Sequence, residues 1–289
     1  MSNSQWSWQE WQGLPYLRCD LLQNWQHGFF TQQFSPQLPE DLVQVLQPEA
    51  QVYRVKQVHG NRVLPTANFE MGAEADGLVA TEADAAVWVC SADCTPALIA
   101  DRTTGKVAAV HAGWRGTAQR IIPESINQLI QTGSKKADLV IALGPAIAGE
   151  VYQVSKQVGA EVGASIMIDL VNDFLDNPLD NSLGNPGDKP LDESVTADKV
   201  NPKVNPKVDP EEILAKLAEL PNSPILSDPH PGRVRLDVRR VNTLQMLHMG
   251  ISAEQISIAP HCTYQQPEYF FSYRRHPQKK VQWSGIVSR

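Results

Sequence analysis

The amino-acid sequence predicts a mixed α/β fold, an α+β sandwich that occupies residues 1–289 as a single domain. Between residues 52 and 154, short apolar runs rich in β-branched residues alternate with one segment of helical period. Mixed signals of this kind are typical of α/β or α+β folds and not of helical bundles or all-β sandwiches. With 289 residues, of which 42% are hydrophobic, the chain can also bury the core that such a fold needs.

The first half of the chain contains most of the expected strands. Four runs that end at turn residues have the strand signature: Asp76–Ala80, Ala85–Cys90, Pro96–Ala100 and Lys106–Val110. Thr117 is expected to cap a helix that ends near Gly133 and whose apolar face carries Ile121, Ile122, Ile126, Leu129 and Ile130. A buried strand, Leu139–Leu143, follows this helix.

The second half is expected to add helices and one more strand. Ser155 opens a short helix, and a further helix ending at Gly250 is predicted because four apolar residues recur at helical spacing, namely Val234, Val238, Val241 and Leu244. Ser252 and Gln255 resemble a capping box, and the apolar run Ile256–Ala259 after them is typical of a strand.

Residues 176–209 differ in composition from the rest of the chain. They are rich in Asn, Pro, Asp and Lys and contain the tandem repeat NPKV at 201–204 and 205–208. Such a segment buries too little apolar surface to offset its ordering entropy, and a longer loop costs little. We therefore expect a flexible insertion within one domain. A boundary between two domains is the weaker alternative.

The charge balance indicates a small-molecule partner. A net charge of −7 argues against nucleic acid or an anionic membrane surface as the partner. Residues 1–16 lack the apolar core of a signal peptide, and no run approaches the roughly 18 apolar residues of a membrane span. We expect a cytoplasmic protein that does not bind membranes, and the sequence predicts no particular oligomeric state.

The cysteines point to metal or catalytic chemistry. Four cysteines in a chain of this length are too few and too scattered for a disulfide framework. Cys94, His59 and His111 each stand where an expected strand gives way to a turn. Zinc accepts thiolate and imidazole ligands, and three protein ligands leave its fourth position open for catalysis. Taken alone, a histidine at a strand end is more often a hydrogen-bonded polar residue than a ligand, and a lone cysteine more often belongs to the core.

Asp93 and Cys94 allow other interpretations. Asp93 could act as a general acid or base or orient a histidine, although a turn leading into Thr95 is the simpler role. Cys94 could instead be a nucleophile whose pKa is lowered by His59 or His111, with Asp93 orienting the base.

Two further segments combine cations with glycines or aromatic residues. Arg115 follows His111 in a glycine turn before an expected helix, an arrangement that suits phosphate or carboxylate. Near the C-terminus, Phe271 and Tyr273 could stack on a base while Arg274 or Arg275 binds an anion. For Phe271 a place in the core is the preferred interpretation, whereas a binding role is preferred for at least one of the two arginines.

Seven segments together resemble one known family, named first for a laccase domain or multicopper polyphenol oxidase and now for purine nucleoside phosphorylase. They are KQVHG (56–60), ADGLV (75–79), ADCTP (92–96), VHAGWRG (110–116), LGPAI (143–147), CTY (262–264) and FFSYRR (270–275). The resemblance implies the family's α/β topology and zinc on His59, Cys94 and His111.

The resemblance also implies a reaction. It implies phosphorolysis of adenosine, inosine and methylthioadenosine, with adenosine deamination and a copper-dependent phenol oxidation as side activities. On this basis Arg115 and Arg274 or Arg275 are expected to hold phosphate, and Asp93 to handle a proton at the base or ribose. Purine nucleosides and phosphate are then the partners, and zinc, with copper as the alternative, is the cofactor.

Two observations qualify the resemblance. Four-electron oxidase chemistry needs several coppers and many histidines, whereas this chain has seven histidines and no His-x-His pair. The segment HGFFT (27–31) matches the family, but QQFS (32–35) replaces the Arg and paired Gly expected after it. The resemblance therefore does not define the N-terminal part of the nucleoside pocket or the preferred nucleoside.

Overall fold

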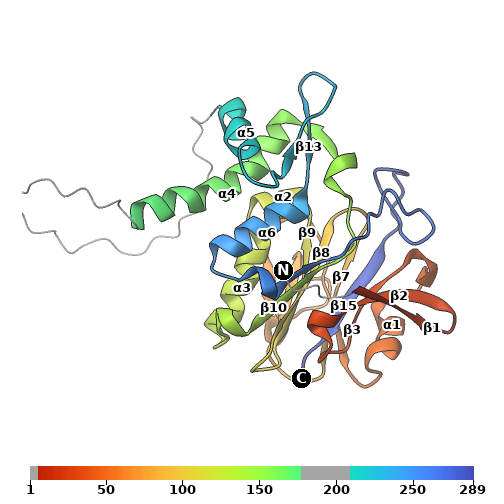
Figure 1. Ribbon diagram of the computed structural model, residues 1–289. Coiled ribbons are helices and arrows are strands. Elements are labelled where there is room, and N and C mark those ends of the chain that lie inside the picture. The colour runs from red at the N-terminus through yellow and green to blue at the C-terminus, as the bar shows by residue number, and fades with distance from the viewer. Residues whose placement is uncertain (1–5, 177–208) are drawn as a thin grey trace, which may run out of the picture.

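The computed structural model describes residues 6–176 and 209–289 and is built around two stacked six-stranded sheets. The first sheet has the order β1-β2-β3-β15-β7-β4. Its strands are β1 (Trp6–Trp11), β2 (Leu14–Cys19), β3 (His27–Phe30), β15 (Gln282–Val287), β7 (Ala85–Ser91) and β4 (Gln51–Arg54). The C-terminal strand β15 lies between β3 and β7, so the first and last strands of the described residues belong to one sheet (Figure 1).

The second sheet has the order β14-β10-β8-β9-β6-β5 and carries most of the predicted strands. They are β14 (Ile256–Ile258), β10 (Leu139–Leu143), β8 (Thr95–Asp101), β9 (Val107–Ala112), β6 (Gly77–Ala80) and β5 (Val63–Pro65). Strands β10, β8, β9 and β6 are antiparallel, and their side chains are almost entirely buried because both faces of the sheet are covered.

The main apolar core fills the space between the two sheets. Phe29 and Val87 of the first sheet pack in one cluster with Leu98 and Val140 of the second. Gly144, just after β10, allows the closest approach, because a Cβ there would lie 2.2 Å from the Phe29 ring.

Helices cover the outer faces of both sheets (Figure 1). Helix α1 (Pro39–Leu46) packs with Trp88 of the first sheet. Helices α2 (Trp114–Ala118), α3 (Ile121–Gln131) and α6 (Val238–His248) lie on the side of the second sheet, where Ile126 and Met246 join its core cluster. The mixed α+β sandwich predicted from the sequence is therefore confirmed.

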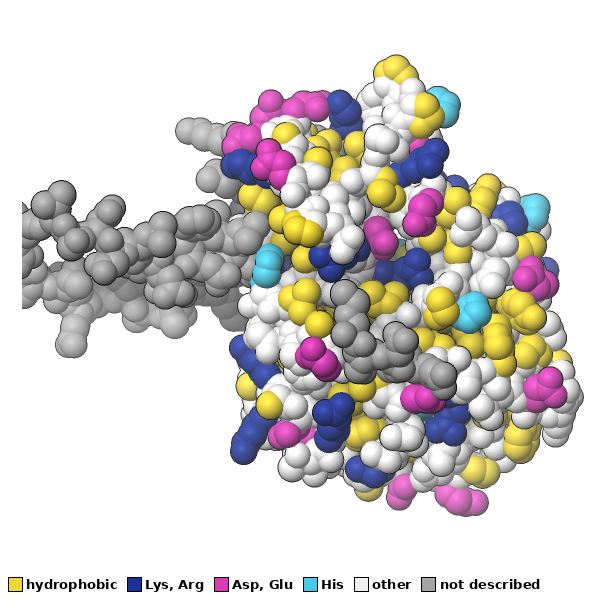
Figure 2. Space-filling view, in the orientation of Figure 1, with side chains coloured by type: hydrophobic (Ala, Val, Ile, Leu, Met, Phe, Trp, Pro, Cys, Tyr) yellow, Lys and Arg dark blue, Asp and Glu magenta, His cyan; other side chains and the backbone are white. Residues whose placement is uncertain are grey.

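A smaller lobe packs against α6 and α2. It contains the three-stranded sheet β11-β13-β12, made of β11 (Gln153–Ser155), β13 (Arg233–Leu236) and β12 (Ile225–Leu226). Helices α4 (Lys156–Asp176) and α5 (Pro210–Ala218) pack against it, with Val162 and Leu217 in their shared core. On the face in Figure 2, acidic side chains gather over α5, whose first turn carries Glu211 and Glu212.

The structure corrects three expected helix boundaries. Thr117 does not cap a helix; it lies inside α2, which starts after Gly113, and α3 starts separately after Arg120 in a left-handed conformation. Val234 belongs to β13 and not to the helix, which begins at Val238 with Asp237 as its cap. The helix after Ser155 is not short, since α4 has 21 residues.

Two other expectations concern the remaining segments. The capping box of Ser252 and Gln255 is confirmed, and β14 follows it. The insertion expected at 176–209 lies outside the described residues, apart from Asp176 and Asp209 at its two ends. Within residues 6–176 and 209–289, no helix combines the length and hydropathy needed to cross a membrane.

Candidate metal centre

His59, Cys94 and His111 come together at one end of the β8–β9 hairpin. Their candidate ligand atoms all lie within 4.8 Å of one another, and the two imidazole rings are 4.9 Å apart at 89°. The strand register explains how two of the three residues meet. Thr95 pairs with Ala112, which places Cys94 beside the end of β9, the strand that carries His111. His59 arrives from the loop after β4. The cluster that the sequence predicts is thus formed by three separate segments.

Asp76 holds the two histidines in place. One carboxylate oxygen accepts hydrogen bonds from the His59 backbone N–H and from Nδ1 of His111, both at 2.9 Å. The other oxygen accepts from the N–H of Gly60 at 2.7 Å and of Val58 at 3.2 Å. With Nδ1 of His111 bonded to this buried carboxylate, Nε2 is the ring nitrogen that would bind a metal, once it has lost its proton.

The residues fit a metal ion sterically and chemically. Gly113 faces the cluster, and a Cβ at this position would lie 3.0 Å from Sγ of Cys94 and within 3.6 Å of both imidazoles. The glycine therefore leaves open the space beside all three side chains. One thiolate and two imidazoles form a donor set that zinc or copper accepts.

Without a metal, the Cys94 thiolate pairs with a protonated His111, so metal binding would release a proton from this imidazole. Burial would raise the pKa of the Cys94 thiol, but the positive charge of His111 and hydrogen bonds from both imidazoles lower it to about 6. Burial would lower the pKa of His111, but the Cys94 thiolate and Asp76 raise it to about 9. Cys94 is therefore a thiolate at neutral pH, which is the form that binds metals.

Cys94 lies between two cavities. The smaller has a volume of about 30 Å³ and is lined by Asp93, Cys94, Ala112, Gly113, Trp114, Ile147, Tyr152 and Val238. The larger has a volume of about 520 Å³ and is also lined by His59, His111 and Tyr273, whose side chain is 58% exposed. A cavity of the larger size can hold a nucleoside-sized ligand.

Asp93 forms the turn that the sequence favoured and also anchors a distant segment. Its φ of +93° lies in the left-handed region, which aspartate tolerates better than most residues. Its carboxylate accepts hydrogen bonds from the Thr263 hydroxyl and from the Arg274 backbone N–H, both at 2.7 Å. Asp76, not Asp93, is the carboxylate that orients a histidine.

Arg115 and Arg274 lie over aromatic rings that line the small cavity. The Arg115 guanidinium is 4.2 Å from the centre of the Trp114 ring, and that of Arg274 is 4.8 Å from the centre of the Tyr152 ring. Both arginines are largely exposed. Two cations thus flank the cavity that reaches Cys94.

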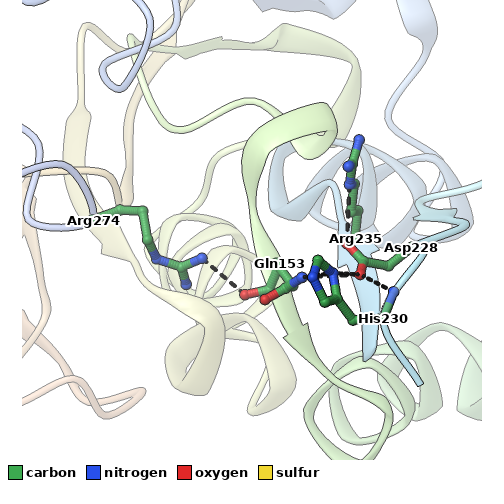
Figure 3. A network of polar contacts seen from close by, with 5 residues as sticks. All are labelled: Gln153, Asp228, His230, Arg235 and Arg274. Atoms are coloured by element: carbon green, nitrogen blue, oxygen red, sulfur yellow. Dashed lines mark hydrogen bonds and ion pairs between the residues drawn. The ribbon is translucent and has the colours of Figure 1, made fainter. Parts of the chain in front are cut away.

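Arg274 is also connected to the small lobe (Figure 3). Its guanidinium donates to the Gln153 backbone oxygen at 2.9 Å, and the Gln153 side chain donates to Asp228 at 2.9 Å. Asp228 also accepts from the His230 backbone N–H and from Arg235, at 2.9 and 3.1 Å. The side chain of Asp228 is only 1% exposed, so this network is a fixed support behind Arg274.

The other candidate substrate-binding residues lie apart from the metal cluster. Phe271 and Arg275 line a third cavity, of about 230 Å³. The Arg275 guanidinium donates to the backbone oxygens of Thr263 and Tyr264 at 2.7 Å and of Phe270 at 2.6 Å. Arg275 therefore fixes the segment that carries Tyr273 and Arg274.

Sequence reasoning missed the roles of Asp76, Trp114 and Tyr152. All three lie in or beside segments discussed above, but the sequence pattern does not show which side chains they contact. The position of Asp76 beside His111 follows from the pairing of β6 with β9, which matches Gly77 to Val110. A predicted pairing of these strands is the signal that could have identified it.

Comparison with known proteins gives consistent results. The family model described as multi-copper polyphenol oxidoreductase laccase matches residues 39–173 and 199–287. A purine nucleoside phosphorylase of Synechocystis sp. is 45% identical over 296 residues, covering 100% of this chain and 99% of that protein.

Solved structures support the fold. YlmD from Geobacillus stearothermophilus superposes with a TM-score of 0.69 at 22% identity, over 98% of each chain. The hypothetical protein YfiH from Bacillus licheniformis gives a TM-score of 0.66 at 20% identity, over 95% of this chain and 96% of that one.

Proposed function

The chain belongs to the family described as multi-copper polyphenol oxidoreductase laccase, and from its site we propose that it is a zinc-dependent purine nucleoside phosphorylase. The observation that carries the proposal is the His59–Cys94–His111 cluster, which lies between a nucleoside-sized cavity and two flanking arginines. The 45% identical Synechocystis protein of that name, which matches the whole chain, supports the choice.

Different residues of the site bind the two substrates of phosphorolysis. Arg115 and Arg274 bind phosphate beside the small cavity, because guanidinium groups match phosphate oxygens with paired donors. Tyr273 offers an exposed ring to a purine in the larger cavity. A phosphate oxygen then attacks C1′ of the ribose as the bond from C1′ to the purine nitrogen breaks. The purine leaves with the electron pair of that bond and takes up the proton that the hydrogen phosphate loses.

Asp93 is better placed to position Arg274 than to carry a proton. Both of its carboxylate oxygens already accept hydrogen bonds, from Thr263 and from the Arg274 backbone. His59, Cys94 and His111 would hold the metal, with Asp76 fixing both histidines. A bound zinc would supply positive charge to an oxygen of the substrate or phosphate.

We propose adenosine, inosine and methylthioadenosine as substrates, with adenosine deamination as a side reaction. Laccase-type oxidation is disfavoured, because the described residues contain a single cluster of three metal-ligating side chains. Copper bound at this cluster could still oxidise phenols. We place the protein in the cytoplasm, in keeping with its four free thiols.

The test is product identification with metal-defined protein and adenosine, with and without phosphate. Adenine that appears only with phosphate supports phosphorolysis, and inosine formed without phosphate supports deamination. Cys94→Ala should lose both the metal and adenine release. Cys262→Ala, which removes another buried thiol, should keep both. Adenine release at the wild-type rate by Cys94→Ala would refute the proposal.

A second candidate is a cysteine hydrolase. Cys94, His111 and Asp76 are arranged as nucleophile, base and orienting carboxylate, with 2.9 Å between Nδ1 of His111 and Asp76. This function requires activity that survives metal chelation and is lost on thiol alkylation. Activity that disappears on chelation and returns with zinc would exclude it.

A further inference from the structure

Two neighbouring cavities lie beside the segment 271–280, and one of them reaches the metal cluster. The 520 Å³ cavity at the cluster and the 230 Å³ cavity beside it share Gln278 and Lys280 as lining residues. Gln278 and Lys280 therefore separate the two cavities and face both of them. We refer to the 230 Å³ cavity as the side cavity.

The side cavity and its rim are basic in an acidic protein. Arg275, His276 and Lys280 line the side cavity, and Lys279 and Lys280 line the larger one. None of the residues lining either cavity in the described part of the chain is Asp or Glu. The whole chain carries a net charge of −7, so these cavities are basic although the protein as a whole is acidic.

One of these cations, Arg275, is fixed in place, and Lys280 is exposed beside an aromatic ring. Three backbone carbonyls hold the Arg275 guanidinium. Since a guanidinium has five N–H donors, others are left for a ligand. The Lys280 ammonium lies 5.8 Å from the centre of the Phe271 ring, at the wall between the two cavities. Gln32, in the segment that departs from the family pattern, also lines the side cavity, and its amide donates to the Pro267 backbone oxygen.

We propose that the side cavity is a phosphoryl-group subsite, in which Lys280, Arg275 and His276 bind a phosphate next to the nucleoside cavity. Cationic donors that converge on a small cavity suit the oxygens of a phosphate better than a single carboxylate. The inference rests on the proposed function for the nucleoside in the larger cavity. Because Arg115 and Arg274 already account for the phosphate that attacks, the preferred ligand here is the 5′-phosphate of a purine nucleotide.

The test measures binding, not turnover, on the full chain loaded with zinc. Calorimetry with inosine, inosine 5′-monophosphate and inorganic phosphate compares the wild type with Lys280→Gln. We expect the variant to bind inosine 5′-monophosphate about tenfold more weakly, the effect of losing one charge-assisted hydrogen bond. Inosine affinity should stay within about twofold, because its ribose carries no charge.

Lys135→Gln is the matched control, since it removes the same charge from an exposed position on another part of the surface. It should bind all three ligands as the wild type does. A loss of affinity for inorganic phosphate alone in Lys280→Gln would assign the same subsite to free phosphate. If neither phosphate ligand depends on Lys280, or if Lys135→Gln has the same effect, the subsite is refuted.

The outcomes separate the two proposals. Nucleotide binding that depends on Lys280 in a protein without phosphorolysis would refute the proposed function and retain the subsite. If the protein catalyses phosphorolysis but binds both phosphate ligands equally well with and without Lys280, the subsite is refuted and the proposed function is retained.

Discussion

Asp76 connects the two histidines of the metal cluster through a single carboxylate. It bonds the backbone around His59 and Nδ1 of His111, and its side chain is fully buried. Partners that orient a histidine typically contribute a factor of about 10 to 100 in metal affinity. The geometry of the cluster therefore depends on a residue that does not itself bind the metal.

Asp76→Asn should lower zinc affinity by about 10- to 100-fold, because an amide cannot accept hydrogen bonds at both ends. Competition with a chromophoric chelator measures the change. Asp101→Asn is the control, since Asp101 is also buried and accepts backbone N–H bonds, from Thr103 and Thr104, at the far end of β8. Equal zinc affinities for the two variants would contradict this role of Asp76.

His27 is a buried neutral imidazole far from the cluster in sequence. Nε2 accepts from the Cys19 N–H and Nδ1 donates to the Trp25 oxygen, both at 2.9 Å. Burial, reinforced by the charge of Arg18, lowers the pKa of His27 from 6.5 to about 4. The unfolded chain therefore binds the extra proton between pH 6.5 and 4, so the folded state loses stability as the pH falls.

This loss reaches about 3 kcal/mol of unfolding free energy across the window. His27→Gln removes the titration, so its stability deficit relative to the wild type should shrink from pH 7.5 to pH 4.5. Urea unfolding at both pH values measures it, with His276→Gln, at an exposed imidazole, as the control. A deficit for His27→Gln that is independent of pH would contradict the argument.

Residue chemistry made part of the site predictable. His59, Cys94 and His111 could be recognised because thiolate and imidazole are intrinsic metal ligands at predicted strand ends. Asp76 and Tyr152 could not, because their roles arise from strand pairing and from a cation–π contact between distant segments. Such contacts exist only once the sheets have formed.

Among the elements, short strands and helix starts were the hardest to predict. Thr117 has the chemistry of a cap, but its hydroxyl donates to Asn242 of α6, 125 positions away. Val234 fits a helical spacing and a strand equally well, and pairing with β11 decides for the strand. Long apolar strands such as β8 and β10 were correct because burial on both faces leaves an unambiguous pattern.

The β11–β13 pair supports Arg274 through Gln153 and Asp228 (Figure 3). In Asp228→Asn only one oxygen remains to accept bonds from Gln153, Arg235 and the His230 backbone. If Arg274 binds phosphate, the KM for phosphate should rise about fivefold with little change in kcat, since one hydrogen bond is worth about 1 kcal/mol.

Steady-state kinetics at varied phosphate concentration measures the effect. Asp209→Asn changes another carboxylate of the small lobe, the cap of α5, which accepts from the Glu211 N–H and does not contact Gln153. This control should leave the KM for phosphate unchanged. An unchanged KM for phosphate in Asp228→Asn, or the same rise in both variants, would contradict the claim that Asp228 positions Arg274.

On the scale of the whole molecule, α6 joins the small lobe to the sandwich. Val241 and Leu244 pack into the small-lobe core, whereas Met246 of the same helix packs into the core of the second sheet. The Gln245 side chain donates to the Thr117 oxygen in α2 at 2.9 Å and to the Ser165 hydroxyl in α4 at 2.7 Å. We therefore propose that the chain folds as one domain, as its sequence suggested.

One domain requires one unfolding transition. Urea unfolding followed by hydrogen exchange of peptides from α5 and from β8 should give the same midpoint. Gln245→Ala leaves the Thr117 oxygen and the Ser165 hydroxyl without this buried partner and should lower the unfolding free energy by about 1–3 kcal/mol. Because α6 couples both cores, the midpoints of both peptides should fall together. A fall confined to α5 would show that the small lobe unfolds independently.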